Sequence, residues 1–566
     1  MWKTFALLAV LLATSCAPGR PSPQAGEAAQ PRPPKTARTL VVASRYEPPS
    51  LAARPLRPVT SPGISVPMFN ATLDYLDERG DPRPYLAEAL PRLDADSWRI
   101  LPQGGMETSY QLRPGLTWHD GQPLTARDFV FAWGVYTTPE FGLSASLPLS
   151  AIEAVEARND RTLLIKWRRL YPDAGALKQG FQPLPQHILQ TPFDRGDADG
   201  FASLPFWTTE WIGAGPFSLT RWELGSFLEA TAFSGHALGR PGLERIRLRF
   251  ILDPNTVVAN LLADEIDMSV DFAIRDEHLA TLKQEWVPRT GGVIVSSPVL
   301  FWATRVQLRP EYASMPSTLE VRVRRALAHA IDKETINEGL LNGQATIIHS
   351  QLPPGASYYP AVERVITKYP FDVRLTQQLL EDAGHVRGRD GMYLAPSGQP
   401  FRPEFRALAN PTQEGENAII VNTLHQAGID ATSYVLPAAS LQDLAVRATF
   451  PGLETGSGGG NVAGLDAYKS TVIAAPSNRW LGNNRGGWIN PEYDGLVEAF
   501  NSTLDANERV GYLAESQRIF TSDLPTIPHF FTPQFTIHSA SLQGPKARQV
   551  PDPAESFNIW EWQWRD

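Results

Sequence analysis

The chain has 566 residues, of which 42% are hydrophobic and 20% are charged. This length exceeds the about 250 to 300 residues at which a single hydrophobic core stops growing, so we expect two or more domains. The formal net charge is -9 and no run of lysines and arginines occurs. This acidic balance argues against nucleic acid as a partner, because its phosphates select basic surfaces.

The first residues have the organisation of a signal peptide. Lys3 supplies a charged start, residues 5–12 are an apolar run, and small residues lead to Cys16, the single cysteine of the chain. The apolar run is too short to cross a membrane core of about 30 Å as a helix. Residues 1–16 resemble a bacterial lipoprotein signal, in which Cys16 is lipidated and becomes the new amino terminus. Ordinary signal cleavage beside an incidental cysteine is the alternative.

A proline-rich stretch follows the signal peptide at residues 17–38. Such a composition cannot bury enough apolar surface to offset the entropy lost on ordering. We therefore predict a disordered tether between the lipid anchor and the folded part of the chain.

The folded part opens with an apolar strand at residues 39–43, and its densest local signal lies at residues 112–133. Turn sequences flank a short extended segment there, and Thr125 with Asp128 forms a capping box that predicts the start of a helix. His119 beside Asp120 suggests an acid/base pair as the alternative. Neighbouring residues of a strand point to opposite faces, so we favour the structural interpretation.

Further elements are predicted along the rest of the chain. The Gly-Ala-Gly-Pro sequence at residues 213–216 predicts a tight turn, and the alternation at residues 245–252 predicts a strand. Apolar spacings of three and four predict helices within residues 320–343 and at residues 372–384, and residues 253–262 are also expected to form a helix. Asp332 is expected to cap the second of two helices in the middle region.

These motifs, taken in their order, resemble the bacterial extracellular solute-binding proteins of family 5. These are the peptide-, nickel- and oligosaccharide-binding lipoproteins of ABC transporters. The segment at residues 112–133 is close to the best-known signature of that family. The resemblance covers about residues 39–562, and its other segments lie at residues 46–51, 69–73, 84–87, 213–219, 253–268, 352–359, 488–496 and 524–530.

The resemblance implies an α/β fold, namely a two-lobed periplasmic-binding-protein-like clamshell (type II, class C-like) with an extra subdomain on the first lobe. The basal lobe would comprise residues 39–62, 211–294 and 529–566, its subdomain residues 63–210, and the second lobe residues 295–528. Two crossings, near residues 291–297 and 526–531, would form the hinge. A ligand that touches both lobes then favours the closed state through its differential affinity.

The resemblance also implies the partners. The protein would be a monomer that is tethered outside the cytoplasm, in the periplasm or at the cell surface, and that delivers a small organic solute to a membrane ABC permease. We expect an oligopeptide as the first choice and an oligosaccharide-like molecule as the second, with no cofactor and no metal.

Specificity is expected where the second lobe faces the cleft, and here the sequence departs from the family. Peptide-binding relatives carry an Ala-Asp-Tyr-like segment whose aspartate holds the amino terminus of the ligand. No aspartate lies at the start of residues 453–466. Glu454 or Asp466 could substitute from a shifted position, so a peptide ligand stays open. The glycine-rich run at residues 456–460 either opens space for a ligand or forms a flexible surface loop. The expected ligand-binding residues are Tyr46, Glu47, Phe69, Asn70, Trp302, Glu454, Gly458, Gly459, Asn461, Asp466, Trp480 and Trp488.

Two other functions compete with transport. A secreted hydrolase finds no support in the sequence, because the His-Glu-x-x-His spacing and the Gly-x-Ser-x-Gly elbow are both absent. Carboxylates that are brought together only by folding would still allow hydrolysis. A sensory or chaperone-like binding lipoprotein would have the same sequence features as a transport component, since the difference lies in its partner.

Overall fold

The computed structural model describes residues 38–56, 63–93, 95–102, 104–141, 143, 147–177, 180–440, 443–551 and 555–565. The predicted signal peptide, Cys16 and residues 17–37 of the predicted tether lie outside the described residues. In this part of the chain, no helix has both the length and the apolar character needed to cross a membrane.

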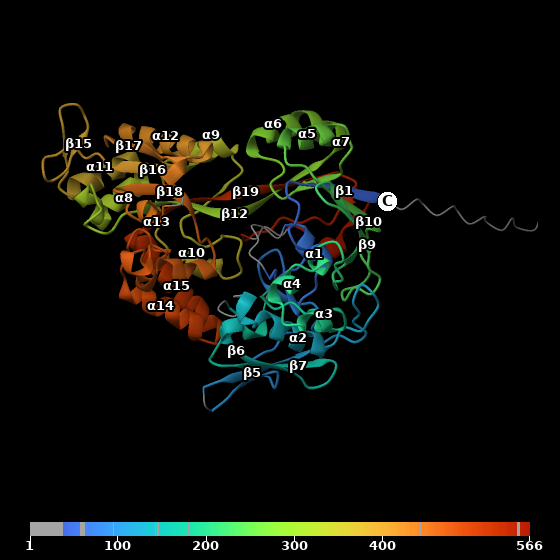
Figure 1. Ribbon diagram of the computed structural model, residues 1–566. Helices are drawn as coiled ribbons and strands as arrows, with labels where there is room; N and C mark the ends of the chain where they lie inside the picture. The colour runs from blue at the N-terminus through green and yellow to red at the C-terminus, as the bar shows by residue number, and fades with distance from the viewer. Residues whose placement is uncertain are drawn as a thin grey trace, which may run out of the picture. The chain divides into compact units, whose positions relative to one another are not determined.

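One mixed sheet of 11 strands organises the fold (Figure 1). Its first half contains, in spatial order, β11 (Met268–Val270), β1 (Thr39–Ser44), β10 (Arg245–Phe250), β9 (Phe227–Ala232) and β8 (Phe217–Glu223). Its second half contains β17 (Thr432–Leu436), β16 (Glu404–Leu408) and β18 (Leu453–Gly458). Between the halves lie β12 (Val293–Val306) and β19 (Thr526–His538), and the short β13 (Thr346–Ile347) pairs with β19.

Strands β12 and β19 are the longest in the sheet, with 14 and 13 residues. They run antiparallel from the pair Val293 and His538 to the pair Arg305 and Thr526, so both halves share them. The register shifts twice on the way, between Pro298 and Leu300 and between Trp302 and Ala303. Such bulges bend and twist a strand pair locally, so the connection between the two halves is not a flat ribbon.

Each half carries its own helices (Figure 1). On the first half, α5 (Pro254–Leu262), α6 (Leu279–Thr281) and α7 (Val287–Thr290) lie together, and α1 (Ser65–Phe69) contacts β8. A separate sheet, in the order β4 (Trp98–Ile100), β5 (Met106–Gln111), β7 (Thr162–Trp167) and β6 (Ile152–Ala157), packs against α2 (Ala126–Tyr136). Helix α3 (Gln186–Phe193) contacts both α2 and α4 (Ala198–Ala202).

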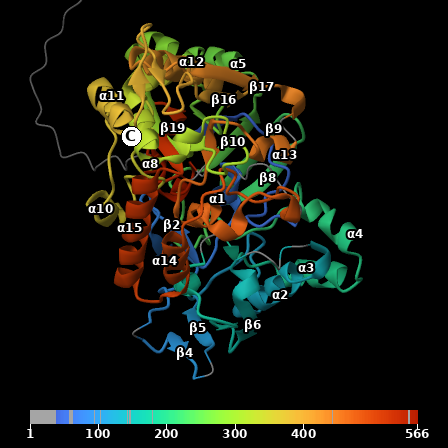
Figure 2. The same ribbon diagram turned by 90° about the vertical axis from the view of Figure 1, so that its left-hand side faces the viewer.

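The second half has two groups of helices. The first group comprises α8 (Val321–Ala330), α9 (Lys333–Leu341), α11 (Val373–Asp382) and α12 (Pro411–Gln426). The second comprises α10 (Tyr359–Glu363), α14 (Pro491–Ser502) and α15 (Ala506–Asp523), of which α14 and α15 lie side by side in Figure 2. Helix α13 (Leu444–Ala448) precedes β18. Three two-stranded sheets complete the described elements: β2 (Asp74–Leu76) with β3 (Pro82–Pro84), β14 (Val386–Arg387) with β15 (Tyr393–Leu394), and β20 (Leu542–Gln543) with β21 (Gln563–Trp564).

The hydrophobic cores follow this division. The buried members of the largest core come from residues 40–270 and 542–562, whereas those of the second core come from residues 302–530. A small cluster of Phe301, Ala303, Ile348 and Phe531 lies where β12 passes β19. The chain thus buries its apolar surface in separate cores that the two long strands connect.

Several local predictions are confirmed. Thr125 caps α2 and Asp128 completes the capping box. Helices α5, α9 and α11 begin after the caps Asp253, Asp332 and Asp372. The expected strands at residues 39–43 and 245–252 are β1 and β10. These features depend on nearest neighbours along the chain, which is why sequence reasoning located them.

The prediction of a tight turn at residues 213–216 is wrong. The hairpin between β8 and β9 turns at residues 224–226 instead. Gly213 and Gly215 are required for close packing, because a Cβ atom at either position would overlap the backbone of Phe69 or Asn70. The sequence shows that glycine is needed there, but only the fold shows which segment approaches it.

Replacing Gly215 by alanine therefore tests the close contact. Because the added methyl group meets backbone atoms that cannot rotate away, we expect Gly215→Ala to lower the free energy of unfolding by about 1 to 3 kcal/mol. The matched control is Gly134→Ala in α2, where nothing lies within 4 Å of the added atom. This control should raise stability by about 0.5 to 1 kcal/mol. Guanidinium unfolding measures both, and equal effects would contradict the packing argument.

Candidate functional site

A cavity of about 1050 Å³ lies where the two halves of the sheet meet β12. Its lining comes from the loop after β1, the β8–β9 turn, the segments after β10 and β11, the bulge of β12 and the segment after β18. The lining residues are Arg45, Tyr46, Glu47, Pro49, Gly225, Phe250, Leu252, Phe272, Val299, Leu300, Phe301, Gly458, Gly459, Gly460, Asn461 and Pro551. We call this cavity the cleft.

One wall of the cleft is apolar and open to solvent. Tyr46, Leu252 and Leu300 are 45%, 69% and 45% exposed. Leu300 lies at the bulge of β12, next to the register shift at Pro298. Exposed apolar side chains that gather in a concavity are typical of a binding site, because their burial by a ligand is favourable.

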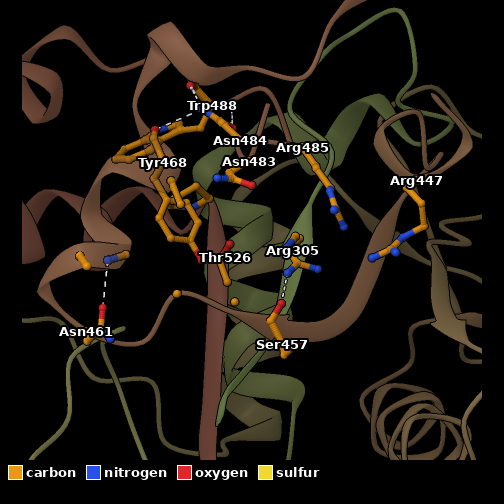
Figure 3. A pocket seen from close by; sticks show the side chains of 17 residues that line it. Arg305, Arg447, Ser457, Asn461, Tyr468, Asn483, Asn484, Arg485, Trp488 and Thr526 are labelled. Carbon is orange, nitrogen blue, oxygen red and sulfur yellow. Dashed lines mark hydrogen bonds between the residues drawn. The ribbon is translucent and has the colours of Figure 1, made fainter. Parts of the chain in front are cut away.

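A second cavity of about 540 Å³ opens beside the cleft and shares Gly458, Gly459 and Asn461 with it (Figure 3). We call it the arginine pocket. Its other lining residues all belong to the second half or to β12 and β19: Arg305, Arg447, Ser457, Ala463, Gly464, Ala467, Tyr468, Asn483, Asn484, Arg485, Gly486, Trp488, Pro525 and Thr526. No acidic residue is among the described residues that line it.

The arginines of this pocket surround one buried carboxylate. In the sheet, Glu454 of β18 lies directly between Arg305 of β12 and Arg406 of β16. Its Oε1 accepts a hydrogen bond of 3.3 Å from Nη1 of Arg305, and its Oε2 accepts one of 2.9 Å from Nε of Arg406 as well as a short one from Nη2. Nη2 of Arg447 lies 4.0 Å from Oε1. Cross-strand register therefore creates this charge cluster.

Arg485 is the arginine that the carboxylate compensates least. In the described part of the chain, no carboxylate oxygen lies within 4.0 Å of the guanidinium group of Arg485. Burial, followed by repulsion from Arg447 and Arg305, lowers the pKa of Arg485 to about 10. Burial likewise lowers the pKa of Arg447. The pocket is thus held at a positive potential.

The glycine run is not a flexible surface loop. Residues 453–458 form β18, which pairs with both β12 and β16. Gly459 packs against Gly464, and a Cβ atom on Gly460 would overlap Phe301. Small residues are needed here so that the chain passes close to its neighbours, and their backbone then lines both cavities.

The structure brings only part of the expected site together. Tyr46, Glu47, Gly458, Gly459 and Asn461 line the cleft. Trp488 reaches the arginine pocket from the core around α14 and α15, in which it is 5% exposed.

The other expected residues do not line either cavity. Phe69 and Asn70 are buried, and Nδ2 of Asn70 donates to the carbonyls of Leu51 and Val66. Nε1 of Trp302 donates to the buried Glu416.

Three further residues also lie apart from the cavities. Trp480 packs edge-on against Tyr312. Asp466 is half-exposed and faces Lys469 and Asn501. Glu454 is fully buried by its arginine partners. The hypothesis that Glu454 or Asp466 holds an ammonium group thus gains no support from their placement.

Sequence reasoning missed Arg305, Arg447 and Arg485. Arg447 lies more than 140 positions after Arg305, and Arg485 lies 38 positions after Arg447. No local sequence pattern marks these residues. Strand pairing places Arg305 beside β18, whereas hydrogen bonds from Arg406 to the carbonyl of Arg447 and from Arg309 to the carbonyl of Arg485 hold the other two segments nearby.

The His119–Asp120 pair does not form. The backbone N–H of Gly213 donates to Nδ1 of His119, and Nε2 lies 3.0 Å from the carbonyl oxygen of Gly215, which makes Nε2 the protonated nitrogen. Asp120 instead contacts Nε2 of His187 at 2.8 Å. Burial lowers the pKa of His119 to about 4. The imidazole is therefore a neutral bridge between two chain segments.

Metal-binding geometry is also absent from the described residues, among which no three histidine, cysteine or acidic side chains are grouped to hold an ion.

Comparison with known proteins identifies the family. The model of the bacterial extracellular solute-binding proteins, family 5, matches residues 88–471. The chain belongs to this family. Its α/β two-lobed fold is that of periplasmic binding proteins, as in the structure of NikA from Brucella suis in complex with Fe(III)-EDTA. That structure is 18% identical, has a TM-score of 0.73, and aligns over 93% of this chain and 100% of its own.

Two relatives found by sequence comparison have names that refer to peptide binding. The oligopeptide-binding protein AppA of Bacillus subtilis (strain 168) is 23% identical over 380 residues, which are 66% of this chain and 65% of AppA. The di/tripeptide-binding protein 2 of Pseudomonas aeruginosa (strain UCBPP-PA14) is 23% identical over 517 residues, 87% of this chain and 88% of its own. The chain thus spans just under two thirds of AppA and most of the second relative.

Removing the charge of Glu454 should destabilise this family member strongly. Glu454→Gln removes the buried carboxylate that pairs with Arg305 and Arg406, and breaking such a buried cluster costs about 3 to 5 kcal/mol. Guanidinium unfolding measures the loss. The control Glu223→Gln removes an exposed carboxylate that pairs with Arg221 and should change stability by less than about 1 kcal/mol. A loss of similar size in both variants would contradict the assigned role.

The neutral His119 predicts a pH dependence of stability. Its pKa is about 4 in the folded chain and 6.5 as the ordinary value. Between these limits the unfolded state binds more protons, so stability falls as the pH falls from 6.5 to 4. In His119→Gln this fall should be smaller by about 1 to 2 kcal/mol. Melting temperatures measured across this range test the point, and parallel curves for both proteins would contradict it.

Proposed function

We propose that the protein is the solute-binding component of an ABC importer and that it captures a peptide in the cleft. The observation that carries this proposal is a cleft of about 1050 Å³ that both halves of the sheet line. Its size suits a ligand of several residues. AppA and the di/tripeptide-binding protein 2, whose names refer to peptides, support this ligand class.

The chemistry of the cleft suits a peptide in two ways. Tyr46, Leu252 and Leu300 offer apolar contact for side chains. The segment from Gly458 to Asn461 brings backbone groups to the wall of the cleft because its glycines have no side chains, and peptide groups can form hydrogen bonds with such backbone. Flat rings and hydroxyl groups would also suit an oligosaccharide, but no specific contact in the cleft favours it over a peptide.

Capture would proceed by closure around the ligand. We propose that residues 39–62, 211–294 and 529–566 form the basal lobe, residues 63–210 its subdomain, and residues 295–528 the second lobe. The segments at residues 291–297 and 526–531 would then act as the hinge. Gly291 has a φ of 67°, which suits a segment that absorbs backbone changes. A ligand held by both lobes stabilises the closed state only by its greater affinity for that state.

We further propose that the protein acts outside the cytoplasm, at the membrane surface. Lipidated Cys16 would tether the monomer outside the cytoplasm, where a membrane permease receives the closed form. A sensory or chaperone-like role would use the same cleft without uptake. Deletion of the gene therefore distinguishes them, because loss of uptake of the bound peptide supports transport and unchanged uptake contradicts it.

Ligand binding should depend on the apolar wall. We expect Leu300→Asp to weaken peptide binding at least about tenfold, because a desolvated carboxylate replaces an apolar contact. The control Val386→Asp changes a side chain that is 64% exposed on β14 and does not line the cleft. Native mass spectrometry first identifies peptides that co-purify from the host, and calorimetry then compares the variants. If the peptide does not make the wild type more compact in small-angle scattering, closure is wrong.

A further inference from the structure

Among the described residues, the arginine pocket carries more positive charge than its neighbouring carboxylate compensates. Arg305 and Arg406 pair with Glu454, and Arg485 adds a guanidinium group with no carboxylate of the described residues within 4.0 Å, so these three arginines and one carboxylate leave a formal excess of two positive charges. Figure 3 shows the guanidinium groups of Arg305, Arg447 and Arg485 pointing toward a common space. They come from β12, α13 and the segment before Trp488.

The carboxylate has little capacity left for these charges. Both of its oxygens accept hydrogen bonds, Oε1 from Arg305 and Oε2 twice from Arg406. Arg406 also donates to the carbonyls of Val446 and Arg447, which holds the end of α13 in place. Arg406 is thus structural, whereas Arg305, Arg447 and Arg485 line the pocket.

Like charges in a partly enclosed cavity repel each other, and such repulsion reduces stability. Arrangements that cost stability are commonly retained for binding. Guanidinium groups bind carboxylates with two parallel hydrogen bonds. An acidic group would therefore relieve the repulsion that the folded chain leaves in this pocket.

The arginine pocket and the apolar cleft are neighbours, because Gly458, Gly459 and Asn461 line both cavities. A ligand that reaches from one cavity into the other would contact Leu300 and Tyr46 in the cleft. The carboxylate in the cleft itself, Glu47, accepts hydrogen bonds from Nε1 of Trp222 at 2.8 Å and from the N–H of Gly225. The wall from the second half is thus positively charged, and the opposite wall is apolar apart from Arg45 and the carboxylate of Glu47.

We propose that the protein selects peptides that end in an acidic residue after apolar residues, with two carboxylates of that end in the arginine pocket. This inference rests on the proposed function and names its substrate class. An excess of two charges is matched by two carboxylates, whereas a carboxyl terminus alone supplies one. The volume of about 540 Å³ has room for an acidic residue.

Calorimetry with two tripeptides tests this selectivity. Leu-Leu-Glu and Leu-Leu-Gln differ by one carboxylate and almost nothing in shape. We expect wild-type protein to bind Leu-Leu-Glu at least about tenfold more tightly than Leu-Leu-Gln. A charge-assisted hydrogen bond in a partly buried site changes affinity by about this factor. In Arg485→Gln the two affinities should agree within about threefold. The variant alone, without ligand, should melt at the same or a higher temperature because one repelling charge is gone.

The control variant Arg402→Gln removes an arginine of the same lobe that pairs with Asp430 on the surface, and it should keep the wild-type preference. Equal affinities of the wild type for the two tripeptides would overturn the inference and leave peptide binding intact. If neither tripeptide nor any longer peptide from a mixed library binds, the proposed function fails and the inference with it. A preference that survives in Arg485→Gln and is lost in Arg402→Gln would also overturn it.

Discussion

The antiparallel pairing of β12 with β19 is the constraint on which the rest of the structure depends. These strands pair from Val293 to Arg305 with two register shifts, and each half of the sheet adds its own strands to them, β11 to β19 and β18 to β12. Backbone hydrogen bonds along such a pair hold two separately packed cores in one sheet. The bulges at Pro298–Leu300 and Trp302–Ala303 interrupt the pairing where the halves meet.

The position of the binding cavities follows from this arrangement. The bulge of β12 turns Leu300 toward the cleft, and the same strand carries Arg305 into register with Glu454 a few residues later. One strand therefore contributes to the apolar wall and to the basic pocket. Because β12 connects both halves, a ligand that contacts it would lie beside the proposed hinge, where its binding energy would favour closure.

Stability and binding compete in the arginine pocket. Glu454 stabilises the junction of β12, β18 and β16, but the arginines that gather around it exceed what one carboxylate neutralises. A core built for stability alone would leave out Arg485, whose pKa of about 10 reflects burial and repulsion. In a binding protein, however, these uncompensated guanidinium groups are preorganised for an anion. The free energy needed to bring them together is spent during folding and does not reduce the affinity for the ligand.

The sequence by itself determined the features that depend on near neighbours. The capping box of Thr125 and Asp128, the cap Asp332, the helices expected at residues 253–262 and 372–384, and the alternation in β10 each depend on a few neighbouring residues. The ordered series of such motifs also identified the family, which the match to residues 88–471 shows. Tyr46 and Gly458 were expected at the cleft from that resemblance and do line it.

Only the tertiary structure decided which charges meet. Glu454 was expected as a partner for a ligand ammonium, but strand register places Arg305 and Arg406 on either side of it. Phe69 and Trp302 were expected at the cleft for their aromatic rings, and packing buries both. The partners of a side chain on a central strand come from segments more than a hundred residues away, and their pairing is set by the hydrogen bonds of the whole sheet. No local pattern encodes it, which is why the site emerged only when the strands were in place.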